Sequence, residues 1–211
     1  MTTSSKIIRL APLSGIAFVA LMVSVIAFEG EELDSSAAPA EVLASWSDRA
    51  DTRLLVASLS AAALLFLLIF AASLRGALRS REPAEASASV VSFAGAVVAA
   101  CGLSLSACLT LAASRAGDAE SAEAVVPLDH LAQSAWLPIT AGFAVMLLAA
   151  GVGGLRSGTL PKTMCWVAMI LGAAFLTPAG IVAFLLLPVW IVVASVMLYR
   201  AQSRQGTPIA A

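Results

Sequence analysis

Long apolar runs separated by short polar segments dominate this chain. Runs of about twenty apolar residues predict helices that cross a bilayer, because the hydrocarbon core is about 30 Å thick and a helix rises about 1.5 Å per residue. The predicted fold is therefore an all-α, polytopic membrane helix bundle that forms one transmembrane domain over residues 1–211. The apolar runs predict six transmembrane helices, at residues 10–28, 54–74, 88–113, 131–155, 162–177 and 180–199.

The last apolar run, residues 163–199, is too long for a single span. It contains no ionisable side chain before Tyr199, and as one helix it would be about 55 Å long. Proline cannot continue a helix, and glycine tolerates the backbone angles of a turn. We therefore expect the chain to turn back at residues 177–180, into either two full spans or a re-entrant hairpin.

The first apolar run predicts a retained membrane anchor. It is nineteen residues long, whereas the apolar region of a cleaved signal peptide has about 7–15 residues. The alternative is a cleaved signal peptide, because Val25 and Ala27 could serve a signal peptidase. The fourth run has two possible starts, because Asp129 would cap a long helix kinked at Pro138, whereas Ser134 would cap a shorter helix with Pro138 in its first turn.

Two polar segments, residues 29–53 and 114–127, are predicted to be loops. The first opens with the acidic residues Glu29, Glu31, Glu32 and Asp34, which we interpret as a solvated cluster without the spacing of a calcium loop. A short surface helix within residues 41–53 would place Trp46 at the level of the lipid headgroups, where amphipathic aromatic side chains collect.

Small residues recur in the third run at the spacing of one helix face. Gly95 with Ala99 and Gly102 with Ser106 each form a small-xxx-small pair. Such pairs let two helix backbones approach closely in lipid. We interpret these four residues as an interface and this helix as the centre of the bundle, although an Ala-rich chain also produces such pairs by chance.

Composition and charge agree with a membrane protein and predict its orientation. The chain is 60% hydrophobic and 12% charged, against about 25% charged residues in soluble domains. Assigning the polar segments alternately to two sides places nine cations and two acids on one side, and three cations and eleven acids on the other. Because Lys and Arg collect in cytoplasmic loops, we expect a multi-pass inner (plasma) membrane protein with both termini in the cytoplasm.

The basic side also predicts a contact with lipid. Arg75, Arg79 and Arg81 directly follow the second run, where cations can meet anionic headgroups. Three arginines at a membrane surface do not form a nucleic-acid module, so no nucleic-acid partner is expected.

Candidate chemistry is sparse. The apolar cores of the predicted spans contain no ionisable side chain of the kind that marks ion or proton pathways. Asp129 and His130 are weak polar candidates, since one carboxylate and one imidazole do not make a metal site. Cys101 and Cys108 would lie about 10 Å apart along a helix, too far for a disulfide. We predict no catalytic residue, cofactor or metal.

The last run contains the one predicted pocket. Pro188 removes a helical hydrogen bond and bends its helix. A bend beside Trp190 would shape a small apolar pocket, and a simple packing role for both residues is the alternative.

Three short motifs carry a resemblance that covers the whole chain: Leu10-Ala11-Pro12 with Gly15, Arg156-Ser157-Gly158-Thr159-Leu160-Pro161-Lys162 with Trp166, and Pro188 with Trp190. They resemble an uncharacterised family of small Ala-rich bacterial membrane proteins with six predicted transmembrane helices. The resemblance implies that architecture and brings no catalytic residues.

The functional hypothesis is a non-enzymatic membrane protein. It would act as an accessory or interaction subunit, with a membrane-protein partner or a second copy, or bind a lipid or another apolar molecule. The alternative is a small-solute transporter or permease. That alternative requires a polar cavity within the membrane, lined by the hydroxyl groups of Ser92, Ser104, Thr140 or Thr177.

Overall fold

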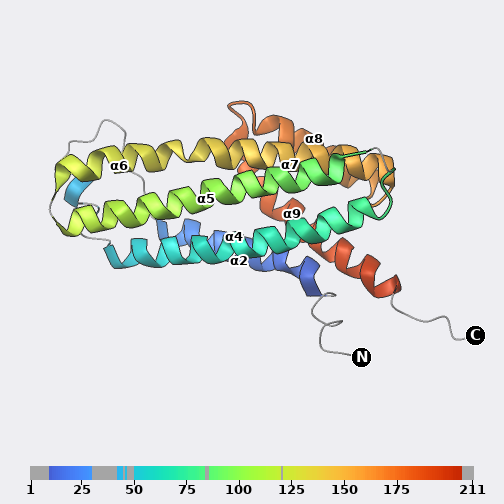
Figure 1. Ribbon diagram of the computed structural model, residues 1–211, viewed down its shortest axis with the longest axis horizontal. Coiled ribbons are helices and arrows are strands. Elements are labelled where there is room, and N and C mark those ends of the chain that lie inside the picture. Colours follow the sequence, from blue (N-terminus) through green and yellow to red (C-terminus); the bar gives the residue numbers. More distant parts are fainter. Residues whose placement is uncertain are drawn as a thin grey trace, which may run out of the picture.

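The structure, a computed structural model, describes residues 10–29, 42–44, 46, 50–83, 86–119 and 121–205 (Figure 1). Within these ranges the chain is helical and contains no strand. In chain order the elements are η1 Ala11–Leu13, α2 Ser14–Glu29, α4 Ala50–Arg79, α5 Ala88–Asp118, α6 Ala122–Ser134, α7 Trp136–Ser157, α8 Lys162–Ala174 and α9 Gly180–Gln205.

Helices of membrane-spanning length confirm the predicted all-α membrane bundle. Five apolar helical segments of the described chain are long enough to cross: Ala11–Phe28, Asp51–Arg79, Ala88–Gly117, Glu123–Ser157 and Gly180–Gln202. The remaining predicted span corresponds to α8, which has 13 residues. At about 1.5 Å per residue α8 is about 20 Å long, shorter than the hydrocarbon core of about 30 Å.

The predicted reversal of the last apolar run is present between α8 and α9. The chain turns at residues 175–179, and α9 begins at Gly180. The Thr177 hydroxyl donates to the Ala174 carbonyl at 2.8 Å and accepts from the Ala179 amide at 3.2 Å. Backbone polar groups that cannot reach water need such partners. The Thr177 hydroxyl therefore supplies partners for two backbone groups of the turn.

α8 and α9 form a hairpin with one short arm. In Figure 1, α8 returns only part of the way along α7 before the chain turns into α9, which crosses the bundle obliquely. The end of α9 and the start of α2 lie at the same end of the bundle (Figure 1). We call this the basic end, because Arg75, Arg79, Arg156 and Lys162 lie in the segments that meet there.

Glycines bring α5 and α7 into backbone contact at the centre of the bundle. A Cβ atom added to Gly95 would lie 2.8 Å from the Gly142 carbonyl oxygen, and one added to Gly102 would lie 2.8 Å from the Ile139 amide nitrogen. Ala99 is fully buried beside them. Large buried side chains fill the remaining core: Leu67, Phe70, Leu74, Phe143, Met146 and Ile191.

The prediction of a loop at residues 114–127 is wrong. α5 continues to Asp118, α6 begins at Ala122, and Pro127 lies inside α6. Proline removes one helical hydrogen bond, but Val125 is fully buried beside it. Burying a valine contributes about 1.5–3 kcal/mol, which helps offset that loss.

Neither predicted cap begins the fourth span. α7 starts at Trp136 with Ala135 in the capping position, and the Ser134 hydroxyl donates back to the His130 carbonyl at 3.0 Å. Pro138 does lie in the first turn of α7, where a missing amide is tolerated. Of the predicted helix within residues 41–53, residues 42–44, 46 and 50–53 are helical, and the others lie outside the described residues, as do Glu31, Glu32 and Asp34.

Candidate functional site

At the end opposite the basic end, the helices continue beyond their apolar segments. On α4 the uncharged stretch from Leu54 to Leu74 already measures about 30 Å. α5 runs on to Asp118, and α6 carries the polar residues Glu123, Asp129 and His130. We call the part beyond the apolar stretches the head; it comprises residues 42–44, 46, 50–53, 113–118 and 122–134. The head has its own apolar core of Val42, Trp46, Ala113 and Val125.

Trp46 joins three segments of the head. It is 3% exposed, its indole Nε1 donates to Asp129 Oδ1 at 3.3 Å, and the Arg53 guanidinium carbon lies 3.5 Å from its ring centroid. A guanidinium on an indole face is an attractive cation–π pair. Trp46 thus links the start of α4 to α6 across 83 residues of chain.

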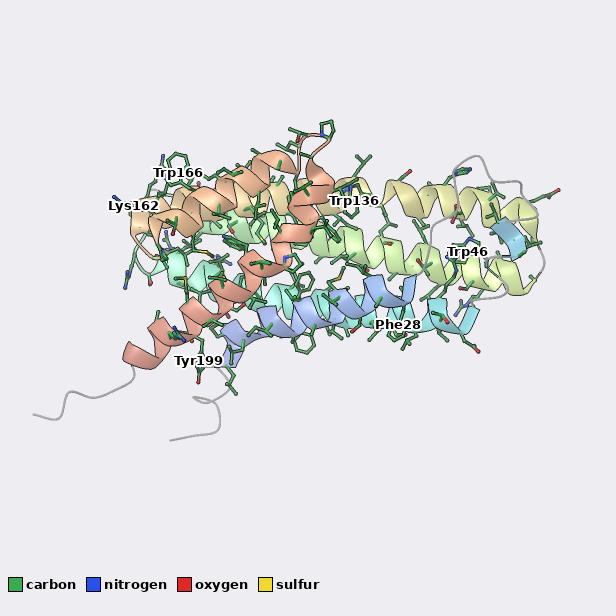
Figure 2. The ribbon with its side chains drawn as sticks, turned by 180° about the vertical axis from the view of Figure 1, so that it is seen from behind. Phe28, Trp46, Trp136, Lys162, Trp166 and Tyr199 are labelled. Atoms are coloured by element: carbon green, nitrogen blue, oxygen red, sulfur yellow. The ribbon has the colours of Figure 1, made fainter. Side chains whose placement is uncertain are left out.

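The prediction that Trp46 lies at the headgroup level stays a prediction, but its side chain is buried by protein. Figure 2 shows Trp46 beyond Trp136 and Phe28 along the bundle, with Lys162 and Tyr199 at the far end. Since α5 and α6 pack against the indole, Trp46 is a core residue of the head. Hydropathy alone does not reveal this packing, because it depends on contacts between segments far apart in the sequence.

The weak polar candidates separate in the structure. Asp129 is half-buried and bonded to Trp46, whereas His130 is exposed. No group of three or more His, Cys, Asp or Glu side chains that could hold a metal ion occurs among the described residues. In the same described part the three cysteines are free thiols, Cys101 and Cys108 on the surface and Cys165 buried.

The indole of Trp190 fills the space beside Pro188 where the sequence predicts a pocket. Pro188 lies inside α9, and Trp190 is 2% exposed. The Trp190 Nε1 donates to the Met164 carbonyl of α8 at 3.1 Å. Trp190 therefore connects α9 to α8 near the basic end.

The four hydroxyl groups named for a transport cavity lie apart. Ser92 is buried and donates to the Met146 carbonyl of α7 at 3.0 Å. Thr140 donates to the Trp136 carbonyl within its own helix. Ser104 is exposed on the surface of α5, and Thr177 stabilises the hairpin turn.

The three arginines at the end of α4 and just after it have different surroundings. The Arg75 guanidinium lies 5.4 Å from the Phe93 ring centroid, Arg81 donates to the Gly158 carbonyl at 3.3 Å, and Arg79 is exposed. Next to them the Ser89 hydroxyl donates to the Glu82 carboxylate at the start of α5. This hydrogen bond holds the pKa of Glu82 below its ordinary value.

A groove of about 490 Å³ lies between the start of α5 and the end of α7 at the basic end. Its walls are apolar except for Ser87 and Arg156. Arg156 lies in the last turn of α7, and Ser87 immediately precedes α5. The register of α5 on α7, set by the contact of Gly95 with Gly142, is what brings the two residues to one groove.

These features define the class of the protein: a multi-pass, all-helical membrane protein. Among proteins already known, no family model, no curated protein and no solved structure matches this chain.

Proposed function

We propose that this chain is a non-enzymatic accessory subunit of the membrane, which uses the head to hold a partner protein in the aqueous phase. The observation that carries the proposal is the second apolar core, centred on Trp46 and lying beyond the membrane-length part of the bundle. Its placement in a bacterial inner membrane, with the basic end in the cytoplasm, remains a prediction from the distribution of cations.

The construction of the head supports a binding role. Fixing the backbone of one residue costs about 1–2 kcal/mol of conformational entropy. A protein that acts only within lipid would gain nothing from ordering the head at that cost. The Trp46 contacts with Asp129 and Arg53 hold the start of α4 and α6 together in one arrangement. A preformed surface of this kind binds a partner with less ordering cost.

The packing of the bundle favours this proposal over a transporter. α5 and α7 touch through their backbones at Gly95 and Gly142, and Ala96, Ala99 and Leu67 nearby are fully buried. Transport sites are built around polar groups and irregular backbone near the bilayer midplane. The separated hydroxyl groups of Ser92 and Thr140, both bonded to carbonyls, offer little of that kind.

Affinity purification of the tagged full-length chain in mild detergent tests the proposal. We expect a distinct protein to co-purify at fixed stoichiometry and Trp46→Ala to lose it, because the variant removes the indole that joins α4 to α6. Trp166→Ala is the matched control, since Trp166 is 57% exposed on α8 and lies far from the head in Figure 2.

Three results would contradict the proposal. They are a lone monomer from the unmodified chain, recovery of second copies only, or equal retention of the partner by Trp46→Ala. Circular dichroism of each variant separates loss of the partner from loss of the bundle, because the long helices dominate the signal.

A further inference from the structure

The groove between α5 and α7 has the length of one leaflet. The residues that line it on α7 run from Val145 to Arg156, a rise of about 16 Å along a helix. Half of a hydrocarbon core is about 15 Å. The groove therefore extends from about the middle of the bilayer to its surface at the basic end.

The wall of the groove suits a hydrocarbon chain. Val91, Val145 and Val152 are 42%, 42% and 36% exposed, and Leu148 and Ala149 are half-buried between them. The volume of about 490 Å³ falls within the range of about 300–1,000 Å³ that is common for small-molecule sites.

The end of the groove at the membrane surface is suited to an anion. Arg156 is exposed and makes no hydrogen bond or ion pair with another residue that the structure describes. Ser87 precedes α5 as its N-cap residue, and its side chain makes no capping hydrogen bond to the helix. A guanidinium binds phosphate through two parallel hydrogen bonds, and a hydroxyl group can add a third.

Neighbouring charged groups leave Arg156 available. The carboxylate of Glu82 accepts bonds from the amide and hydroxyl of Ser89, and Arg81 is bonded to the Gly158 carbonyl. Among the described residues that line the groove, Arg156 is the one with a charge.

We propose that this groove binds one anionic phospholipid, with an acyl chain along Val91, Val145 and Val152 and the phosphate at Arg156 and Ser87. The site is distinct from the head and does not depend on a partner protein. Its ligand is drawn from the leaflet at the basic end.

Native mass spectrometry of the full-length protein, delipidated in detergent, tests the site. The probes are phosphatidylglycerol, phosphatidylcholine and inorganic phosphate. We expect one phosphatidylglycerol molecule to be retained in preference to phosphatidylcholine, and Arg156→Gln to lower that preference about 10-fold, because charge-assisted hydrogen bonds are about twice as strong as neutral ones. Val152→Trp should lower retention of both lipids by filling the groove. Millimolar inorganic phosphate should not compete, since it has no chain.

Arg200→Gln is the matched control, because Arg200 is an exposed cation at the same end on α9. Equal retention of the two lipids by the unmodified chain would overturn the proposal. So would an equal effect of Arg200→Gln and Arg156→Gln, which would show a general surface charge, or full competition by inorganic phosphate, which would show an anion site without a chain. Arg156→Lys keeps the charge and should restore part of the preference if Arg156→Gln perturbs only binding.

Discussion

Adding one methyl group at Gly95 should weaken the bundle more than any conservative change on its surface. The new Cβ atom would lie 2.8 Å from the Gly142 carbonyl oxygen and 2.9 Å from Met146 Cα. The first distance falls short of the 3.4 Å lower limit of ordinary contact by 0.6 Å. Both neighbours are backbone atoms, which cannot rotate away as a side chain can. Gly95→Ala must therefore push α5 and α7 apart.

The expected cost follows from that displacement. A radial gap of about 0.5–1 Å forfeits a quarter to a half of each dispersion contact, and inserting a methylene into a packed core costs about 1–3 kcal/mol. Because α5 and α7 pack together over most of the length of α7, we expect Gly95→Ala to lower the free energy of unfolding by about 2–3 kcal/mol. Reversible unfolding in mixed detergent micelles, followed by circular dichroism, measures it.

Gly76→Ala is the matched control. Nothing lies within 4 Å of a Cβ atom added there, and alanine is favoured over glycine in a helix by up to about 1 kcal/mol. Both substitutions replace glycine with alanine, but their effects on the free energy of unfolding should have opposite signs. Equal effects on unfolding, or a stabilising Gly95→Ala, would refute the close contact between α5 and α7.

Three other perturbations have defined outcomes. Thr177→Val should destabilise the hairpin by about 0.5–1.5 kcal/mol, because it removes the exposed hydrogen bond that the Ala179 amide donates to the Thr177 hydroxyl; unfolding in micelles measures this. Trp46→Ala should speed amide exchange in α6 while the exchange of α5 at Ala99 stays slow, since only the head loses its core; hydrogen-exchange mass spectrometry separates the two. The Ser89 hydroxyl lowers the pKa of Glu82 below its ordinary value of 4.5, so this carboxylate stabilises the fold above pH 4.5. Its contribution is lost as the pH falls through the lowered pKa. Glu82→Gln should reduce the fall of Tm in that acid range, and an unchanged Tm profile would count against the bond.

The parts of the fold that sequence predicts are those governed by the bilayer. Uninterrupted apolar runs predict the spans because a charged side chain is costly in lipid. The turn between α8 and α9 follows from the excess length of residues 163–199 and from Pro178, which cannot continue a helix. Hydropathy does not give the length of α8, because the turn is as apolar as the helices beside it.

The head and the groove depend on contacts between distant segments. In the sequence Pro127 indicates a loop, because the burial of Val125 against the segment that contains Trp46 is not visible there. Arg156 and Ser87 lie 69 positions apart in the sequence, and only the close register of α5 on α7 brings them to one groove. Small residues such as Gly95 indicate that another helix packs closely against α5, but they do not identify that helix as α7.

The most direct test of the whole architecture is the accessibility of single cysteines in intact cells. Cys101, Cys108 and Cys165 are first replaced by serine or alanine, and one cysteine is introduced at Thr159, Gln202 or Ala124, which mark the α7–α8 connection, the end of α9 and the head. A membrane-impermeant maleimide should label the Ala124→Cys chain from outside and spare the other two until the membrane is opened. Labelling of the Gln202→Cys chain from the same side as Ala124→Cys would contradict the account, because α9 would then end on the side of the head.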